Sequence, residues 1–293
     1  MPTVPSATFT YEAADGLAVV AYRWDAVGSP VGAVQLTHGM GEHVRRYGEL
    51  AQAFAARGFV VYGQDHRGHG ATARSAAELG NLGEGGWPGL VDDIGRLAAV
   101  IRAELPGLPL VLLAHSMGSF AAQQFLLEHS GDVDAVILTG TAALDVLEPV
   151  LDLDQPLDLS MFNTPFAPAR TEFDWLSRDE AQVDAYVADP FCGFGLEQSA
   201  AKAMFEGARR LADPAAVAVM RSDLPLCIAV GEQDPVNGGL ALFEALVRRY
   251  REAGLTDVTT HVYPGARHEI LNETNRAEVI SDLLAWTAKA VQP

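Results

Sequence analysis

Cysteine and lysine are scarce in this chain of 293 residues. Cysteine occurs only as Cys192 and Cys227, and lysine only as Lys202 and Lys289. The cysteines form no C-x-x-C pair and no sequence cluster with histidine, so nothing in their spacing indicates a zinc site. Two cysteines also make no disulfide framework, and a reduced, intracellular environment is expected.

The chain also lacks long apolar runs and an excess of positive charge. No apolar run reaches the roughly 18 residues that a membrane span needs. The start, MPTVPSATFT, lacks the charged region and long apolar core of a signal peptide. The formal net charge of −18 repels phosphate backbones and anionic lipid surfaces. We therefore expect a cytoplasmic protein that binds neither nucleic acid nor anionic membranes, and no motif indicates a cofactor or a bound metal.

Apolar residues, at 49% of the chain, are numerous enough for a large core. After a predicted antiparallel hairpin over residues 8–24, apolar runs alternate with helical patterns. Such alternation predicts an α/β fold, with a mostly parallel central sheet flanked by helices. The predicted strands are 33–37, 59–62, 109–114, 135–139, 225–230 and 258–263, and the predicted helices are 47–57, 90–105, 117–129, 239–253 and 275–290.

The alternation stops between residues 141 and 222. This stretch contains six prolines and no clear buried strand, so it is expected to be helical or irregular. We predict an inserted helical cap at 141–222, between the two parts of an α/β core at 1–140 and 223–293.

A serine stands between the predicted strand 109–114 and the predicted helix 117–129. The pattern Ala114-His115-Ser116-Met117-Gly118 matches the nucleophile elbow G-x-S-x-G, with alanine in place of the first glycine. The turn is tight, and small residues two positions before and after the serine avoid clashes. Ser116 is therefore the candidate nucleophile. The alternative is that it only caps the following helix.

Serine needs a neighbouring base, and in this fold the base and the acid follow it on later loops. Two histidines come after the predicted cap. His261 lies inside a predicted strand, which favours a structural role, whereas His268 lies in the loop beyond that strand and is the predicted base. The loop after strand 225–230 offers two carboxylates. We predict Asp234, which precedes a proline that restricts its backbone, with Glu232 as the alternative.

Acyl transfer builds negative charge on a carbonyl oxygen, which two preorganised N–H donors can stabilise. One donor is the residue after the nucleophile, Met117. The other comes from the loop after strand 33–37, which reads HGMGEH at residues 38–43. Glycines in this loop let the backbone approach the substrate closely. We predict the N–H groups of Met40 and Met117 as the oxyanion hole.

Taken together, these motifs resemble the monoacylglycerol lipase and lysophospholipase group of α/β hydrolases. The resemblance covers most of the chain, with several separated motifs in the same order. Two positions depart from the family pattern, Ala114 in the elbow and Ser119, where the family commonly has a second glycine. The matching segments are 38–43, Arg46-Tyr47, 65–70, 115–118, 176–178, Val183-Asp184, Tyr186, Asp189-Pro190, 231–234 and 265–268.

The resemblance implies Ser116, Asp234 and His268 as a catalytic triad, without a cofactor. It also implies that Glu42 and Arg46 lie near the glycerol end of the pocket, although the two may form only a structural ion pair. Five further residues are expected at the substrate. They are Gly39 in loop 38–43, His115 next to Ser116, and the aromatic residues Phe162, Phe166 and Phe191 of the predicted cap.

The start of the predicted cap has an apolar helical face formed by Leu144, Leu147, Val150 and Leu151. Acidic residues such as Asp145 and Asp152 alternate with it. This charge disfavours docking on anionic lipid, so we expect the face to pack over the active site. The predicted substrate is a monoester with an apolar portion, monoacylglycerols included.

Two other functions use the same sequence features. A peptidase of the proline iminopeptidase type would share the serine, aspartate and histidine, and would need an acidic grip on the substrate amine. A non-catalytic binding protein on this fold generally lacks a triad member, whereas all three are present here.

Overall fold

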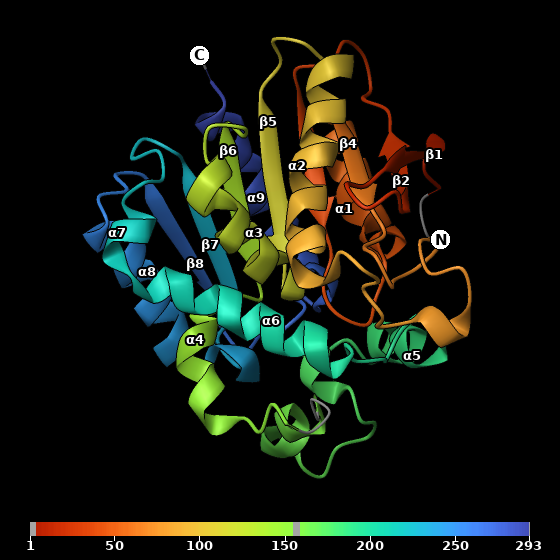
Figure 1. The fold of residues 1–293 in the computed structure, drawn as a ribbon, viewed down its shortest axis with the longest axis vertical. Helices are drawn as coiled ribbons and strands as arrows, with labels where there is room; N and C mark the ends of the chain where they lie inside the picture. The colour runs from red at the N-terminus through yellow and green to blue at the C-terminus, as the bar shows by residue number, and fades with distance from the viewer. Residues whose placement is uncertain (1–3, 155–158, 293) are drawn as a thin grey trace.

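The computed structural model describes residues 4–154 and 159–292, and its centre is an eight-stranded sheet in the order β1-β2-β4-β3-β5-β6-β7-β8 (Figure 1). The pairs β1–β2 and β2–β4 are antiparallel, and all other neighbouring strands are parallel. The strands are β1 Ala7–Glu12, β2 Ala18–Trp24, β3 Gly32–Thr37, β4 Phe59–Gln64, β5 Leu110–His115, β6 Ala135–Thr139, β7 Leu226–Gly231 and β8 Val258–Tyr263.

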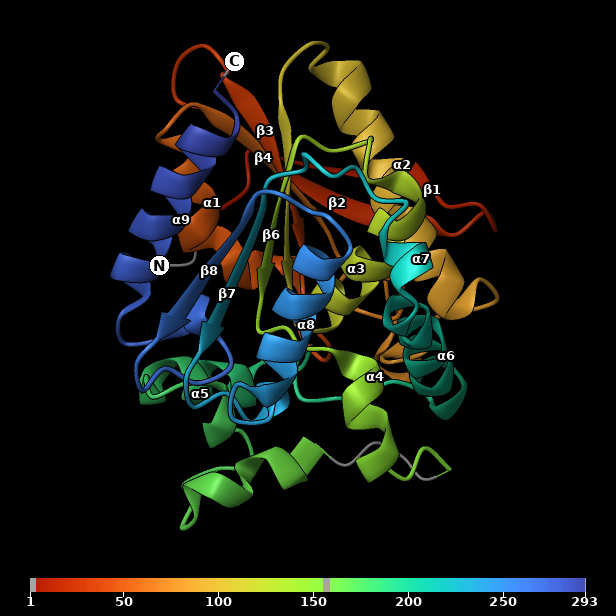
Figure 2. The ribbon, with the colours of Figure 1, turned by 90° about the vertical axis from the view of Figure 1, so that its left-hand side faces the viewer.

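Helices cover both faces of this sheet (Figure 2). On one face lie α1 (Gly48–Ala55) and α9 (Arg276–Ala290), and on the other lie α2 (Gly86–Glu104), α3 (Met117–His129) and α8 (Ala241–Glu252). Strands β3 to β7 are buried along their whole length, because apolar side chains on both faces pack against helices. The predicted α/β fold is thus confirmed.

The start of α2 differs from its predicted position. The helix begins at Gly86, four residues before the predicted start at residue 90, and it contains Pro88 in its first turn. Proline is tolerated there because the first N–H groups of a helix have no partner inside the helix. Pro88 therefore lies inside the helix, before the predicted start at residue 90.

The segment between β6 and β7 consists of helices and 3₁₀ turns, most of which lie beyond the carboxyl ends of the parallel strands, whereas its last helix lies beside α8 (Figures 1 and 2). Its described residues contain no strand. Helix α6 also packs against α2 and α3, so part of this segment is joined to the main body. Its helices are α4 Leu144–Leu147, α5 Glu180–Ala188, α6 Gln198–Ala208 and α7 Pro214–Val217, with 3₁₀ turns at Glu148–Val150, Leu159–Phe166, Asp174–Leu176 and Arg209–Ala212.

A helix that crosses a membrane must be both long and apolar. Among residues 4–154 and 159–292, no helix combines these two properties.

Candidate active site

Ser116 sits at the sharp turn between β5 and α3. Its backbone is strained, with φ 50° and ψ −122°, a region that residues other than glycine rarely adopt. Gly118 makes the turn possible, because a Cβ atom there would lie 2.5 Å from the carbonyl oxygens of Thr37 and His38. The turn presents the serine side chain at the carboxyl edge of the sheet.

His268 and Asp234 meet Ser116 from two other loops. The Nε2 atom of His268 lies 2.8 Å from Ser116 Oγ, and its Nδ1 atom lies 3.0 Å from each carboxylate oxygen of Asp234. His268 and Asp234 are 2% and 1% exposed, so bulk water does not weaken these contacts. The structure thus brings together three residues that the sequence predicted.

The charges around His268 favour its protonated form. Burial opposes a charged imidazole, but the Asp234 carboxylate outweighs burial and raises the pKa of His268 above its ordinary value. His115, whose ring centre lies 4.9 Å from that of His268, behaves differently. Burial, with His268 nearby, lowers the pKa of His115 to about 3, so this ring stays neutral.

The space beside both rings is kept open by Gly140, just after β6. A Cβ atom on this residue would come within 2.6 Å of His115 and 3.0 Å of His268. His115 is held from the same side by Thr139, whose Oγ1 lies 3.0 Å from Nδ1. The end of β6 therefore holds His115 in place and leaves room for the His268 ring.

The two alternative residues lie elsewhere. Glu232 accepts a hydrogen bond from the backbone N–H of Gly265 at 2.9 Å and is exposed. His261 stacks on Tyr263 within β8. Neither contacts the His268 ring in the described structure, so Asp234 is the carboxylate partner.

Loop 38–43 reaches the serine from the end of β3. A Cβ atom on Gly39 would meet Ser116 Cβ at 3.2 Å and Glu42 Oε1 at 2.8 Å, so only glycine fits. The Gly39 N–H donates to Glu42 Oε1 at 2.7 Å and is therefore engaged within the loop. The next N–H group, that of Met40, remains our candidate oxyanion donor together with that of Met117, and both residues line the cavity around Ser116.

A buried ion network braces this loop against the loop of His268. Arg46 donates to Glu42 at 2.6 Å and to both oxygens of Glu269 at 2.6 and 2.7 Å, and Tyr47 donates to Glu42 at 2.7 Å. Burial raises the pKa of Glu42, whereas Arg46 outweighs burial and lowers the pKa of Glu269 to about 2. Glu269 was not predicted, and its place directly after His268 is the signal that could have identified it.

A cavity opens above Ser116, with about 670 Å³ of space between its lining atoms, part of which is open to solvent. Its polar end contains Glu42, His115 and Glu269. The rest of its wall is mainly apolar and comes largely from the segment between β6 and β7. The apolar lining residues are Phe120, Leu144, Leu147, Leu151, Leu159, Phe162, Trp175, Leu176, Met204, Phe205 and Val236.

Known proteins are similar to this chain in sequence and in fold. A family model described as Hydrolase_4, serine aminopeptidase S33, matches residues 28–275. Monoacylglycerol lipase of Mycolicibacterium smegmatis is 32% identical, over 92% of this chain and 93% of the relative. This chain belongs to the Hydrolase_4 family.

Further relatives narrow the type of hydrolase. Human monoglyceride lipase is 26% identical over 94% of this chain and 88% of its own length. A thermostable carboxyl esterase of Bacillus coagulans, solved with glycerol, has a TM-score of 0.88 and 28% identity, covering 99% of this chain and all of its own. The resemblance predicted from the motifs is confirmed: the chain is an α/β hydrolase of the monoacylglycerol lipase type that acts on carboxylic esters.

The aromatic residues that were expected at the substrate, all from segment 141–222, divide into two groups. Phe162 lines the cavity and packs against Trp175, with ring centres 5.2 Å apart. The expectation that Phe166 and Phe191 also line it is corrected. Phe166 stacks under the Arg267 guanidinium at 4.1 Å, and Phe191 lies edge-on to His43. Phe166 packs on a cation and Phe191 on an imidazole, and sequence spacing reveals neither partner.

The apolar face at the start of the same segment points inward. Leu144, Leu147 and Leu151 all line the cavity. Of the acidic residues between them, Asp145 binds Arg249 of α8 through both carboxylate oxygens. The face therefore packs over the serine of this hydrolase.

Proposed function

We propose that this hydrolase cleaves monoesters with an apolar acyl chain, monoacylglycerols among them, with Ser116 as nucleophile, His268 as base and Asp234 as the residue that orients the base. The observation that carries the proposal is the contact series from Ser116 Oγ through His268 to Asp234, at 2.8 and 3.0 Å. The cytoplasmic location expected from the sequence remains a prediction, which fractionation of the producing cells would test.

Acylation uses these three side chains in turn. Ser116 Oγ attacks the ester carbonyl carbon while its proton moves to His268 Nε2, and the carbonyl oxygen becomes an oxyanion. The N–H groups of Met40 and Met117 stabilise this charge. When the ester bond breaks, His268 returns the proton to the leaving alcohol, and the acyl group stays on Ser116.

Deacylation repeats the sequence with water. Water gives a proton to His268 Nε2 and attacks the acyl carbon, a second oxyanion forms, and its collapse frees the acid and returns the proton to Ser116. Asp234 stabilises the imidazolium in both steps without accepting its proton.

The division of the cavity supports an ester with one apolar and one polar part. The apolar wall from Leu144 to Phe205 suits an acyl chain, and the end near Glu42 and Glu269 suits a hydroxylated alcohol. The names of the Mycolicibacterium and human relatives point to the same substrate class. We propose that segment 141–222 acts as the cap that supplies this wall.

Hydrolysis of p-nitrophenyl esters of graded chain length, beside monoacylglycerol and lysophospholipid, tests the substrate. Turnover of monoacylglycerol and of medium-chain esters is expected. Labelling with a fluorophosphonate probe tests the nucleophile, and we expect it to disappear in Ser116→Ala and to persist in the control Ser222→Ala, whose side chain is exposed.

The same assays separate the alternatives. Turnover of aminoacyl naphthylamides without ester hydrolysis would favour the peptidase that the family description names. The buried carboxylates that line the cavity, Glu42 and Glu269, are already paired with Arg46, which leaves them poorly suited to hold a substrate amine. Absence of both labelling and turnover would favour a binding protein and contradict the proposal.

A further inference from the structure

Outside the catalytic cavity, three potential metal ligands meet at one point. His43 ends the loop that carries Met40, Asp189 follows α5, and Cys192 lies three residues further on. One donor atom from each lies within 4.8 Å of the others. We propose that His43, Asp189 and Cys192 form a binding site for one zinc-like divalent cation.

The chemistry of the three side chains selects the type of ion. Imidazole nitrogen, carboxylate oxygen and thiolate sulfur are together the ligands of zinc and its transition-metal neighbours. Magnesium and calcium prefer sites made of oxygen alone. The separation of 146 residues between His43 and Asp189 hides this cluster from any rule of sequence spacing, which is why the sequence indicated no metal.

The positions of the ligands are close to those a bound ion requires. His43 Nε2 already lies 3.0 Å from Asp189 Oδ2. The other Asp189 oxygen accepts from Phe191 N at 2.9 Å, and Cys192 N donates to the Asp189 carbonyl at 3.0 Å, so a turn holds the thiol near the carboxylate. Tetrahedral zinc places its ligand atoms roughly 3.5 Å apart. The largest separation must therefore close by about 1 Å, which a rotation of the cysteine side chain can supply.

His43 has bonding capacity that the protein does not use. Its side chain is 6% exposed, and within residues 4–154 and 159–292 its Nδ1 atom has no hydrogen-bond partner. A neutral imidazole that donates from Nε2 keeps a lone pair on Nδ1, and the other tautomer offers the lone pair of Nε2. Only the tautomer protonated on Nδ1 presents a lone pair from Nε2 on the side of Asp189, so a cation at this cluster would bind that tautomer and replace the contact between Nε2 and Asp189.

The surroundings permit a cation to enter and remain. A broad surface cavity is lined by His43 and Asp189, though not by Cys192, and leaves room for water as a fourth ligand. Three arginines line the same cavity: Arg46 is balanced by Glu42 and Glu269, and Arg276 by Glu49 and Asp179, whereas the charge of Arg45 opposes a bound cation.

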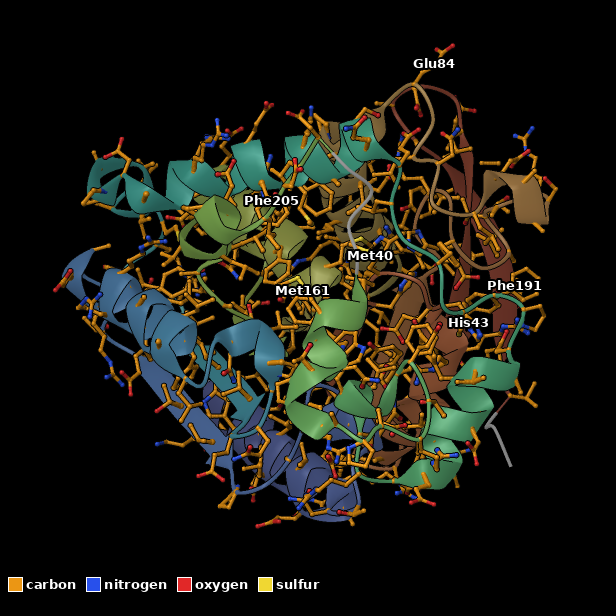
Figure 3. All side chains as sticks on the ribbon, turned by 90° about the horizontal axis from the view of Figure 1, so that it is seen from below. Met40, His43, Glu84, Met161, Phe191 and Phe205 are labelled. Atoms are coloured by element: carbon orange, nitrogen blue, oxygen red, sulfur yellow. The ribbon has the colours of Figure 1, made fainter. Side chains whose placement is uncertain are left out.

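The proposed site joins segment 189–194 to the loop of the oxyanion donor. Gly193 N donates to Gly41 O at 3.0 Å, and a Cβ atom on Gly41 would lie 2.3 Å from the Phe194 carbonyl oxygen. Figure 3 shows His43 next to Phe191, to one side of Met40. A cation bound here would tie the two segments together and raise the thermal stability of the chain.

Metal binding by the whole chain tests the proposal. After treatment with a chelator and its removal, zinc titrated against a chromophoric competitor should bind at one ion per chain. Cys192→Ser and His43→Gln should each weaken binding at least tenfold, and zinc should raise the Tm of the unaltered chain only. Cobalt used as a probe should show a thiolate-to-metal charge-transfer band, which Cys192→Ser abolishes.

A matched control is available on the surface. His129 and Asp132 also form a histidine–carboxylate pair at 3.0 Å, but no cysteine joins them in the described structure. His129→Gln should therefore leave zinc binding unchanged. Circular dichroism shows whether each variant is folded. No zinc binding by the unaltered chain, or binding that folded Cys192→Ser and His43→Gln retain, would overturn the proposal.

Discussion

The two walls of the catalytic cavity are built from different interactions. The wall on the sheet side consists of loops at the ends of β3, β5, β7 and β8, where Ser116, Asp234, His268, Arg46 and Glu269 are joined by hydrogen bonds of 2.6 to 3.0 Å. The wall from segment 141–222 is largely apolar. Hydrogen bonds are directional and apolar contacts are not. The first wall therefore fixes the chemistry, and the second can change the choice of substrate without changing the chemistry.

The largest expected effect belongs to the polar wall. Asp234→Asn keeps the shape of the side chain but stops it stabilising the imidazolium, and kcat should fall about 10⁴-fold for every ester alike. Steady-state kinetics on short and long p-nitrophenyl esters would measure this. The matched variant is Glu232→Gln, which should change kcat little. A large loss in Glu232→Gln, with Asp234→Asn active, would reverse the assignment of the acid.

Removal of Arg46 should mainly lower the stability of the folded chain, and only secondarily its catalytic rate. Arg46→Met leaves the buried carboxylates of Glu42 and Glu269 without their common cation, which should cost roughly 3–5 kcal/mol in the free energy of unfolding. Urea denaturation would measure the loss. Arg210→Met is the control, because Arg210 and Glu128 form an exposed pair and such pairs contribute little. An Arg46→Met chain as stable as the original would show that the two loops need no ion network.

The apolar wall should respond selectively. Leu147→Trp fills part of the cavity, so kcat/KM for long-chain esters should fall roughly tenfold, while short-chain esters are nearly unaffected. The neighbouring Val146→Trp is the control, because Val146 is 43% exposed and does not line the cavity. Equal losses for all chain lengths in Leu147→Trp would contradict the division of labour between the two walls.

The smallest effect concerns pH. The base must be neutral to accept a proton, so activity should decline as pH falls through the pKa of His268, which burial opposes but Asp234 holds above the ordinary value near 6.5. Glu269 also raises this pKa, and Glu269→Gln should move the acid limb of kcat/KM to lower pH. His261→Gln should leave the limb in place. If the acid limb of kcat/KM does not move in Glu269→Gln, the Glu269 charge does not influence the pKa of His268.

The raised pKa of His268 also affects the stability of the folded chain, but this effect depends on pH in the opposite direction to activity. Because the folded chain holds the His268 proton more tightly than the unfolded chain, this contribution is complete below the ordinary histidine pKa. It is lost as pH rises through the pKa of the folded state. The pH at which the base becomes active is therefore the pH at which its ion pair stops contributing.

Local sequence was sufficient to predict most strands of the central sheet and the helix that follows Ser116. The predicted strand 258–263 and helix 117–129 coincide with β8 and α3, since apolar runs and helical periodicity reflect the immediate neighbourhood. The same reasoning identified Ser116, Asp234 and His268, because each follows a recognisable strand. Parallel strands then bring their carboxyl ends to one edge.

Contacts between distant segments were beyond the same reasoning. Glu269 pairs with Arg46 across 223 residues, and no pattern within either loop indicates the other. Segment 141–222 has no sustained period, so its aromatic residues could not be assigned to a wall. Phe162 lines the cavity, whereas Phe166 packs on Arg267 and Phe191 packs on His43.

The span of these contacts has a consequence for synthesis of the chain on the ribosome. Ser116 and His268 are 152 residues apart, and Arg46 and Glu269 are 223 apart. Closing such long loops is entropically costly, and contacts of this range slow folding. A nascent chain that still lacks β8 and the loop after it has no base and no partner for Arg46. Appearance of esterase activity during translation would therefore report docking of the last strand, later than the collapse of the earlier ones.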